Sequence, residues 1–163
     1  MVFEMISNNI TRMLDSKKIR YKTFEFPPEK LGAVEVAALL KVPAEQVYKT
    51  IVITREGKGK PVLALVPGPG EVDLKSLANV LREKKVHLPT EREAEQITRL
   101  QAGGISPLAL VNRGFKVVID FSAQTFDQIY ISGGQRGLDI RISPYDLGTL
   151  THAEFANINK TSS

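Results

Sequence analysis

Two neighbouring apolar segments, Tyr48 to Arg55 and Val62 to Val66, constrain the fold more than any other feature of the sequence. Tyr48 to Arg55 is rich in β-branched residues, and the connecting stretch Glu56 to Pro61 contains two glycines and a proline. This arrangement is typical of two antiparallel strands joined by a hairpin turn. Val62 to Val66 is among the longest apolar runs, and it is far shorter than the ~20 residues of a membrane-spanning helix.

The rest of the chain alternates between helical and strand-like patterns. The spacing of apolar residues and the capping signals predict helices over Phe3 to Leu14 and Gly32 to Lys41, after Asp73, after Thr90, and after Ser143-Pro144 and Thr151 with Glu154. Further strands are expected over Ile19 to Phe26, Val86 to Leu88, Lys116 to Phe121, Ile129 to Ser132 and Leu138 to Ile142. About seven short strands among helices predict an α/β or α+β fold with a mixed sheet, and a partial barrel is one form of it. A length of 163 residues favours a single domain, residues 1–163.

The scarcity of reactive side chains excludes several classes of function. The chain has no cysteine, which rules out disulfides, cysteine-ligated metals and a cysteine nucleophile. Its two histidines, His87 in a predicted edge strand and His152 in the first turn of a predicted last helix, favour surface roles over a catalytic triad. No phosphate-binding glycine motif is present. We therefore expect no metal and no cofactor, and a soluble, cytoplasmic protein.

The charge is mildly basic. There are 22 Lys and Arg against 18 Asp and Glu, a formal net charge of +4, with clusters at Lys17 to Lys22 and Lys58 to Lys60. These clusters fit either solvated faces or contacts to a phosphate backbone. Only eleven Phe and Tyr, and no Trp, argue against a platform for stacking single-stranded bases.

Lys49 and Asp139 are the charged residues whose positions stand out. Lys49 alternates with Ile51 and Ile53 and so shares their face of the strand, where an anion must answer its charge if that face is a pocket. Asp139 lies inside a strand between Leu138 and Ile140, and Lys49 is a candidate counter-ion for it. The alternatives are a lysine at the exposed start of a strand and a surface acid in a hairpin.

Two loops and one strand end complete the candidate features. Gly103 to Pro107 contains two glycines that allow a ligand to approach backbone N–H groups closely, although an ordinary loop has the same composition. The segment Ser132 to Gly137 is richer in glycine than a two-residue hairpin requires. Asp120 ends a strand and is expected to cap the following turn.

These segments together resemble the YbaK/EbsC family, free-standing relatives of the editing domain of bacterial prolyl-tRNA synthetases. The resemblance rests on Val47 to Thr50, Gly103 to Pro107, Ile119-Asp120 and Ile129 to Ile140, in this order, and extends from about Ile10 to Ile158. It implies a mixed, barrel-like β-sheet flanked by helices and an aminoacyl-tRNA deacylase. Thr50 after Lys49 resembles the branch that removes cysteine from Cys-tRNA(Pro).

The resemblance also implies roles for individual residues. Lys49 would hold the terminal phosphate or ribose region of the substrate, and Thr50 and Asp139 would shape and polarise the amino-acid pocket. Backbone contacts to the aminoacyl group or the terminal adenosine would come from two loops: Gly103, Gly104, Ile105, Ser106 and Pro107, and Ser132, Gly133 and Gly134. At the pocket entrance, Phe26 and Leu31 stand where that branch usually has Tyr and Phe.

The mechanism implied by the family is substrate-assisted, because the cysteinyl thiolate attacks its own ester. Prolyl-tRNA synthetase is the implied protein partner, and neither DNA nor a membrane is expected as a partner. Two alternatives remain open. One is a deacylase for Ala-tRNA(Pro) or another small aminoacyl-tRNA, and the other is a non-catalytic module that binds prolyl-tRNA synthetase and tRNA.

Overall fold

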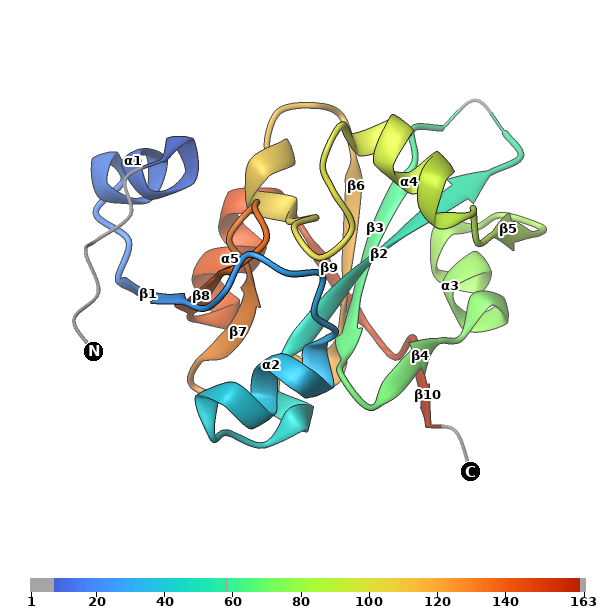
Figure 1. Ribbon diagram of the computed structural model, residues 1–163. Helices are drawn as coiled ribbons and strands as arrows, with labels where there is room; N and C mark the ends of the chain where they lie inside the picture. Colours follow the sequence, from blue (N-terminus) through green and yellow to red (C-terminus); the bar gives the residue numbers. More distant parts are fainter. Residues whose placement is uncertain (1–7, 58, 162–163) are drawn as a thin grey trace.

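The computed structural model describes residues 8–57 and 59–161 (Figure 1). Its helices, including three short 3-10 helices, are α1 (Asn9–Ser16), α2 (Ala33–Leu40), η1 (Ala44–Gln46), α3 (Leu74–Leu81), α4 (Glu91–Thr98), η2 (Pro107–Leu110), η3 (Phe121–Thr125) and α5 (Pro144–Thr151). Its strands are β1 (Tyr21–Glu25), β2 (Tyr48–Arg55), β3 (Val62–Pro67), β4 (Gly70–Val72), β5 (Val86–His87), β6 (Lys116–Asp120), β7 (Ile129–Ser132), β8 (Leu138–Ile142), β9 (Glu154–Ala156) and β10 (Asn159–Thr161).

The hairpin predicted from the two apolar segments forms the centre of the larger sheet. Strands β2 and β3 pair antiparallel, with Tyr48 opposite Pro67 and Ile53 opposite Val62. The sheet has the order β5-β2-β3-β6-β9, and the β3–β6 and β6–β9 pairs are parallel. Every residue of β3 is buried, because apolar clusters cover both faces of the sheet. The predicted mixed sheet flanked by helices is confirmed.

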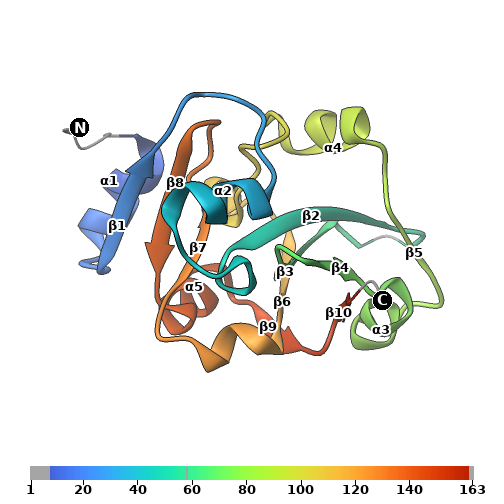
Figure 2. The same ribbon diagram turned by 60° about the horizontal axis from the view of Figure 1, so that its bottom comes forward.

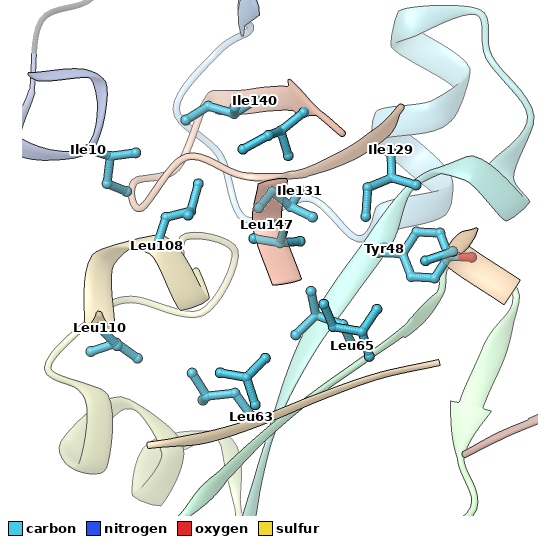
Figure 3. Packing of buried hydrophobic residues seen from close by; sticks show 14 of the residues in the cluster. Ile10, Tyr48, Leu63, Leu65, Leu108, Leu110, Ile129, Ile131, Ile140 and Leu147 are labelled. Carbon is cyan, nitrogen blue, oxygen red and sulfur yellow. The ribbon is translucent and has the colours of Figure 1, made fainter. Parts of the chain in front are cut away.

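A smaller antiparallel sheet, β1-β8-β7, packs across from the larger one. Figure 3 shows the core between them, in which Ile129, Ile131 and Ile140 of the small sheet face Leu63 and Leu65 of β3. An isolated parallel bridge from Val47 to Tyr130 joins the start of β2 to β7. The two sheets therefore meet along one side, and the first residues of β2 lie close to β7 and β8.

Local signals mark the ends of several helices as predicted. Thr90 and Glu93 form a reciprocal capping box at the start of α4, with N-to-oxygen distances of 3.1 and 2.9 Å. Asp73 caps α3 by accepting a hydrogen bond from the backbone N–H of Ser76. The predicted N-terminal helix is present as α1, capped by Asn8, and its predicted first turns fall outside the described residues.

The C-terminal prediction is wrong in one respect. Glu154 does not open a helix: it begins β9, which pairs with the edge of β6, and its carboxylate lies 3.3 Å from the ammonium of Lys116. His152 ends α5 in a left-handed conformation (φ 54°) instead of starting a last helix. The spacing of Thr151 and Glu154 imitates a capping box, but pairing with the open edge of β6 outweighs that local preference. The sequence also missed β4 and β10, which pair with each other.

No helix among the described residues combines the length and apolar character that a membrane span requires.

Candidate active site

A cavity of about 310 Å³ opens where β2 passes the small sheet. Its walls are the segment before α2, the first half of β2, the segment from Leu88 into α4, the Gly103 loop, the end of β7 and the start of β8. The lining residues that the sequence predicted are Phe26, Leu31, Lys49, Thr50, Gly103, Ile105, Ser132 and Asp139. Segments far apart in the sequence thus converge on one concave site.

Lys49 lies on β2, opposite Val66 of β3, and its side chain reaches the cavity wall. Burial lowers the pKa of the Lys49 ammonium, and the negative charge of Glu71 on β4 partly offsets this effect. Glu71 lies outside the cavity that contains Asp139. The cation in this cavity therefore has a nearby carboxylate, but that carboxylate is not Asp139.

Asp139 is only 7% exposed, and it lies in β8 between Phe24 of β1 and Ser132 of β7. Within residues 8–57 and 59–161 its carboxyl has no hydrogen-bond or ion-pair partner. Burial therefore raises the pKa of Asp139 to about 8. The predicted ion pair with Lys49 is not formed, because the two residues share the cavity without a salt bridge. At neutral pH Asp139 is a protonated acid that can donate a hydrogen bond.

Thr50 is the second polar residue of the cavity without a partner. Its hydroxyl oxygen is buried and makes no hydrogen bond among the described residues. Alternation along a regular strand would point Thr50 away from Lys49, yet both line the same cavity. A buried hydroxyl without a partner costs free energy, so Thr50 and Asp139 together leave polar groups at the site that a ligand can satisfy.

The two glycine-rich loops pack against each other. A side chain at Gly104 would meet the backbone of Gln135 at 2.9 Å, and Arg136 donates a hydrogen bond to the carbonyl of Ala102 at 2.7 Å. Gly103 adopts a φ of +89° and lines the cavity. The close approach at Gly104 therefore explains one glycine by packing rather than by contact with a ligand.

Five predicted site residues do not line the cavity: Gly104, Ser106, Pro107, Gly133 and Gly134. Ser106 is fully buried and caps η2, in which Pro107 is the first residue, by accepting from the N–H of Leu108. Gly133 donates its N–H to the carbonyl of Leu138, and Gly134 lies against Ile10 with a φ of +93°. In the structure these residues shape the two loops behind the cavity wall.

The sequence missed one wall of the cavity, formed by Leu88, Pro89 and Glu91. The carboxylate of Glu91 also forms an ion pair with the ammonium of Lys30, with an N–O distance of 2.7 Å. This ion pair ties the segment before α2 to the start of α4. Leu88 lines the cavity and is nevertheless 62% exposed. That exposure is visible only in the structure, since the residue resembles any apolar residue at a strand end.

The cavity has hydroxyl side chains, Thr50 and Ser132, but among the described residues no histidine lies beside them that could activate one as a nucleophile. No histidine or cysteine is among its lining residues, and within the described parts of the chain no three His, Asp or Glu side chains gather as metal ligands. The site offers the cation of Lys49, the buried acid Asp139, and the hydroxyls of Thr50 and Ser132. Such groups can bind, orient and polarise a substrate, but hydrolysis requires a nucleophile from elsewhere.

Comparison with known proteins identifies the family. The model of the aminoacyl-tRNA editing domain matches residues 27–150. The chain belongs to the aminoacyl-tRNA editing domain family. It is 35% identical, over 92% of both chains, to EbsC of Enterococcus faecalis, which is provisionally named a Cys-tRNA(Pro)/Cys-tRNA(Cys) deacylase.

Two further relatives place the domain in context. A proline–tRNA ligase of Thermodesulfovibrio yellowstonii is 31% identical over 76% of this chain, which spans 20% of the ligase. A crystal structure described as a candidate trans-editing enzyme for prolyl-tRNA synthetase covers 95% of this chain and 99% of its own, with a TM-score of 0.78 and 24% identity. The editing-domain fold therefore occurs both inside a synthetase and as a free-standing chain.

Proposed function

We propose that the protein is an aminoacyl-tRNA deacylase that removes cysteine from Cys-tRNA(Pro) in trans. One observation carries the proposal: an editing-domain cavity that holds Lys49, Thr50 and Asp139 but no histidine or cysteine. Cysteine is a substrate that supplies the missing nucleophile itself. The similarity to EbsC over nearly the full chain supports the same substrate.

The reaction then consists of an intramolecular attack. The cysteinyl thiolate attacks the carbonyl carbon of its own ester, a C–S bond forms, and the bond from that carbon to the 3′-oxygen of the tRNA breaks. The departing oxygen takes up a proton, and water later opens the cyclic thioester. Positioning alone contributes about 7–11 kcal/mol to a well-oriented intramolecular step.

Each polar residue of the cavity has a role in this step. The ammonium of Lys49 favours the thiolate over the thiol and attracts the phosphate or ribose end of the substrate. Protonated Asp139 donates a hydrogen bond to oxygen at the reacting ester, where negative charge develops. The hydroxyl of Thr50 gains in the bound substrate the partner that it lacks in the free protein. Ser132 and the backbone at Gly103 complete the contacts to the aminoacyl group.

The size of the cavity fits a small amino acid with its ribose. Phe26, Leu31 and Ile105 give it apolar walls, and an apolar pocket separates side chains of similar size by only about 10–200-fold. The same limit applies to the amino-acid pocket of a synthetase for proline, because cysteine and proline are similar in size. A second site is therefore needed to remove cysteine. We place the protein's action in the cytoplasm beside prolyl-tRNA synthetase, as its relation to a synthetase domain suggests.

The test follows loss of the aminoacyl ester from Cys-, Ala- and Ser-tRNA(Pro). We expect the cysteinyl ester to be removed fastest, and Lys49→Ala to reduce its removal by about 10²-fold or more, as for the loss of one preorganised charged group. Lys84→Ala is the matched control, because it removes an exposed lysine outside the cavity. An S-methylated cysteinyl ester should resist hydrolysis.

Other outcomes separate the alternatives. Equal hydrolysis of the S-methylated ester would exclude self-attack while leaving a deacylase. Faster removal of alanine would assign the protein to Ala-tRNA(Pro). Binding of tRNA and synthetase without any ester loss would overturn the enzyme in favour of a binding module.

A further inference from the structure

A second hollow adjoins the candidate active site. It has a volume of about 420 Å³, and Lys49, Ile51 and Leu88 line both it and the first cavity. Its other walls come from β4, the start of α3 and β10, which lie together in Figure 2. Those walls consist of Glu71, Val72, Asp73, Leu74, Lys75 and Lys160.

We propose that this second hollow receives the unpaired nucleotides that precede the terminal adenosine of the aminoacyl-tRNA. Lys75 and Lys160 contact their phosphates. The inference rests on the proposed function, because it assumes that the ester lies in the first cavity. It assigns to the same substrate a surface that, apart from Lys49, has no role in the deacylation chemistry.

Continuity of the two hollows is the first argument. Lys49 lies on their common border, so a strand whose aminoacyl end occupies the first cavity and which passes Lys49 enters the second hollow. The 3′ end of every tRNA is single-stranded and can follow such a path. A volume of this size is also in the range of cavities that hold small organic ligands.

The charges of the hollow are the second argument. Two carboxylates face the lysines, but each has a local role. Asp73 caps α3 through the Ser76 N–H, at 3.0 Å. This hydrogen bond lowers the pKa of Asp73, and the nearby charge of Lys160 helps to lower it. Glu71 lies opposite Lys160 in the β4–β10 pair, and its charge acts on Lys49. Lys75 is exposed and forms no ion pair among the described residues. With Lys49, the lysines outnumber the acids by three to two, which favours the phosphates of a nucleotide strand.

The apolar part of the hollow is the third argument. Its apolar walls include Ile51, Val72, Leu74 and Leu88. Leu88 is exposed and lies on the border that both hollows share. Proteins that bind single strands combine cations along the backbone with aromatic side chains on which the bases stack. None of the described residues that line this hollow is aromatic, so Leu88 and its neighbours offer the bases apolar contact without stacking.

The test compares the double variant Lys75→Ala/Lys160→Ala with the wild type, in the absence of synthetase, on two substrates. The first is Cys-tRNA(Pro), and the second is the 3′-cysteinyl ester of adenosine, which lacks the preceding nucleotides. We expect kcat/KM on the tRNA to fall about tenfold through KM. Its dependence on log[salt] should become shallower by about 1.4, the value for two contacts to a single strand. Hydrolysis of the adenosine ester should not change.

The double variant Lys84→Ala/Lys85→Ala is the matched control, because it removes the same charge from exposed lysines outside both hollows. The inference is overturned if the two double variants behave alike on tRNA, or if the Lys75/Lys160 variant loses activity equally on both substrates. It is also overturned if a defect appears only after prolyl-tRNA synthetase is added, which would make the hollow a synthetase contact. A wild-type protein inactive on both substrates would instead refute the proposed function.

Discussion

Two buried aspartates of this protein have opposite surroundings. Asp120, 5% exposed, accepts hydrogen bonds at one oxygen from the N–H groups of Ile158 and Asn159, both at 3.0 Å. Its other oxygen accepts from the N–H and the hydroxyl of Ser122. Asp139 is buried to nearly the same extent, and its carboxyl has no such partner within the described residues.

The difference shows what each carboxyl does in the folded chain. Asp120 sits at the end of β6 and ties it to Ile158 and to Asn159, the first residue of β10, so its hydrogen bonds stabilise the architecture. Asp139 adds nothing of that kind, and burial raises its pKa to about 8. A polar group retained without partners in a cavity is typical of a functional site rather than of a core.

Asp120→Ala gives the largest expected change in stability. It removes four hydrogen bonds to a carboxylate and leaves the buried N–H of Ile158 and the partly buried N–H of Asn159 without partners. We expect the free energy of unfolding to fall by on the order of 4 kcal/mol, measured by urea denaturation. Asp127→Ala removes an exposed aspartate nearby and should change stability by less than about 0.5 kcal/mol. Equal effects would show that Asp120 is not a structural anchor.

Asp139→Asn should raise the free energy of unfolding instead of lowering it, and the size of this gain should depend on pH. In the unfolded chain the carboxyl ionises above its ordinary pKa of 3.8, whereas in the folded protein it stays protonated up to about 8. Between these two pKa values the unfolded state therefore binds fewer protons than the folded state. In this window the free energy of unfolding of the wild type falls by up to about 1.4 kcal/mol per pH unit as pH rises. The variant avoids this loss.

We expect a net gain for Asp139→Asn on the order of 2 kcal/mol at neutral pH, since the buried amide lacks partners of its own. The gain should vanish near the low-pH end of the window. Denaturation curves of both proteins at several pH values measure it, with Asp127→Asn as the control. A difference between wild type and variant that stays constant with pH would contradict the raised pKa of Asp139.

The contrast between the two aspartates also marks what the sequence could reveal. Asp120 was expected to cap the turn after its strand, and it does so through Ser122. That role depends on residues adjacent in sequence. The two further hydrogen bonds to Ile158 and Asn159 could not be predicted, because they depend on where the chain returns some forty residues later.

The same distinction applies to the fold and the site. The hairpin of β2 and β3 and the capping box at Thr90 follow from local patterns, and the structure confirms them. Strand β9 follows from the open edge of β6, a property of the assembled sheet, so the local pattern at Glu154 misled the prediction. The wall at Leu88 and the missing partner of Asp139 arise only from packing of distant segments.

The smallest expected effect comes from two threonines on one strand. The hydroxyl of Thr50 is buried without a partner, whereas the hydroxyl of Thr54 donates to the carbonyl of His87 at 3.3 Å. Thr50→Val should therefore stabilise the protein by about 1 kcal/mol, and Thr54→Val should destabilise it by about 1 kcal/mol. Thermal unfolding of both variants measures the two changes in stability.

Because Thr50 shares its cavity with Asp139, the stabilised variant Thr50→Val should also remove cysteine from Cys-tRNA(Pro) more slowly. If Thr50→Val were as destabilising as Thr54→Val, the Thr50 hydroxyl would have a partner in the free protein. The unsatisfied character of the cavity would then rest on Asp139 alone.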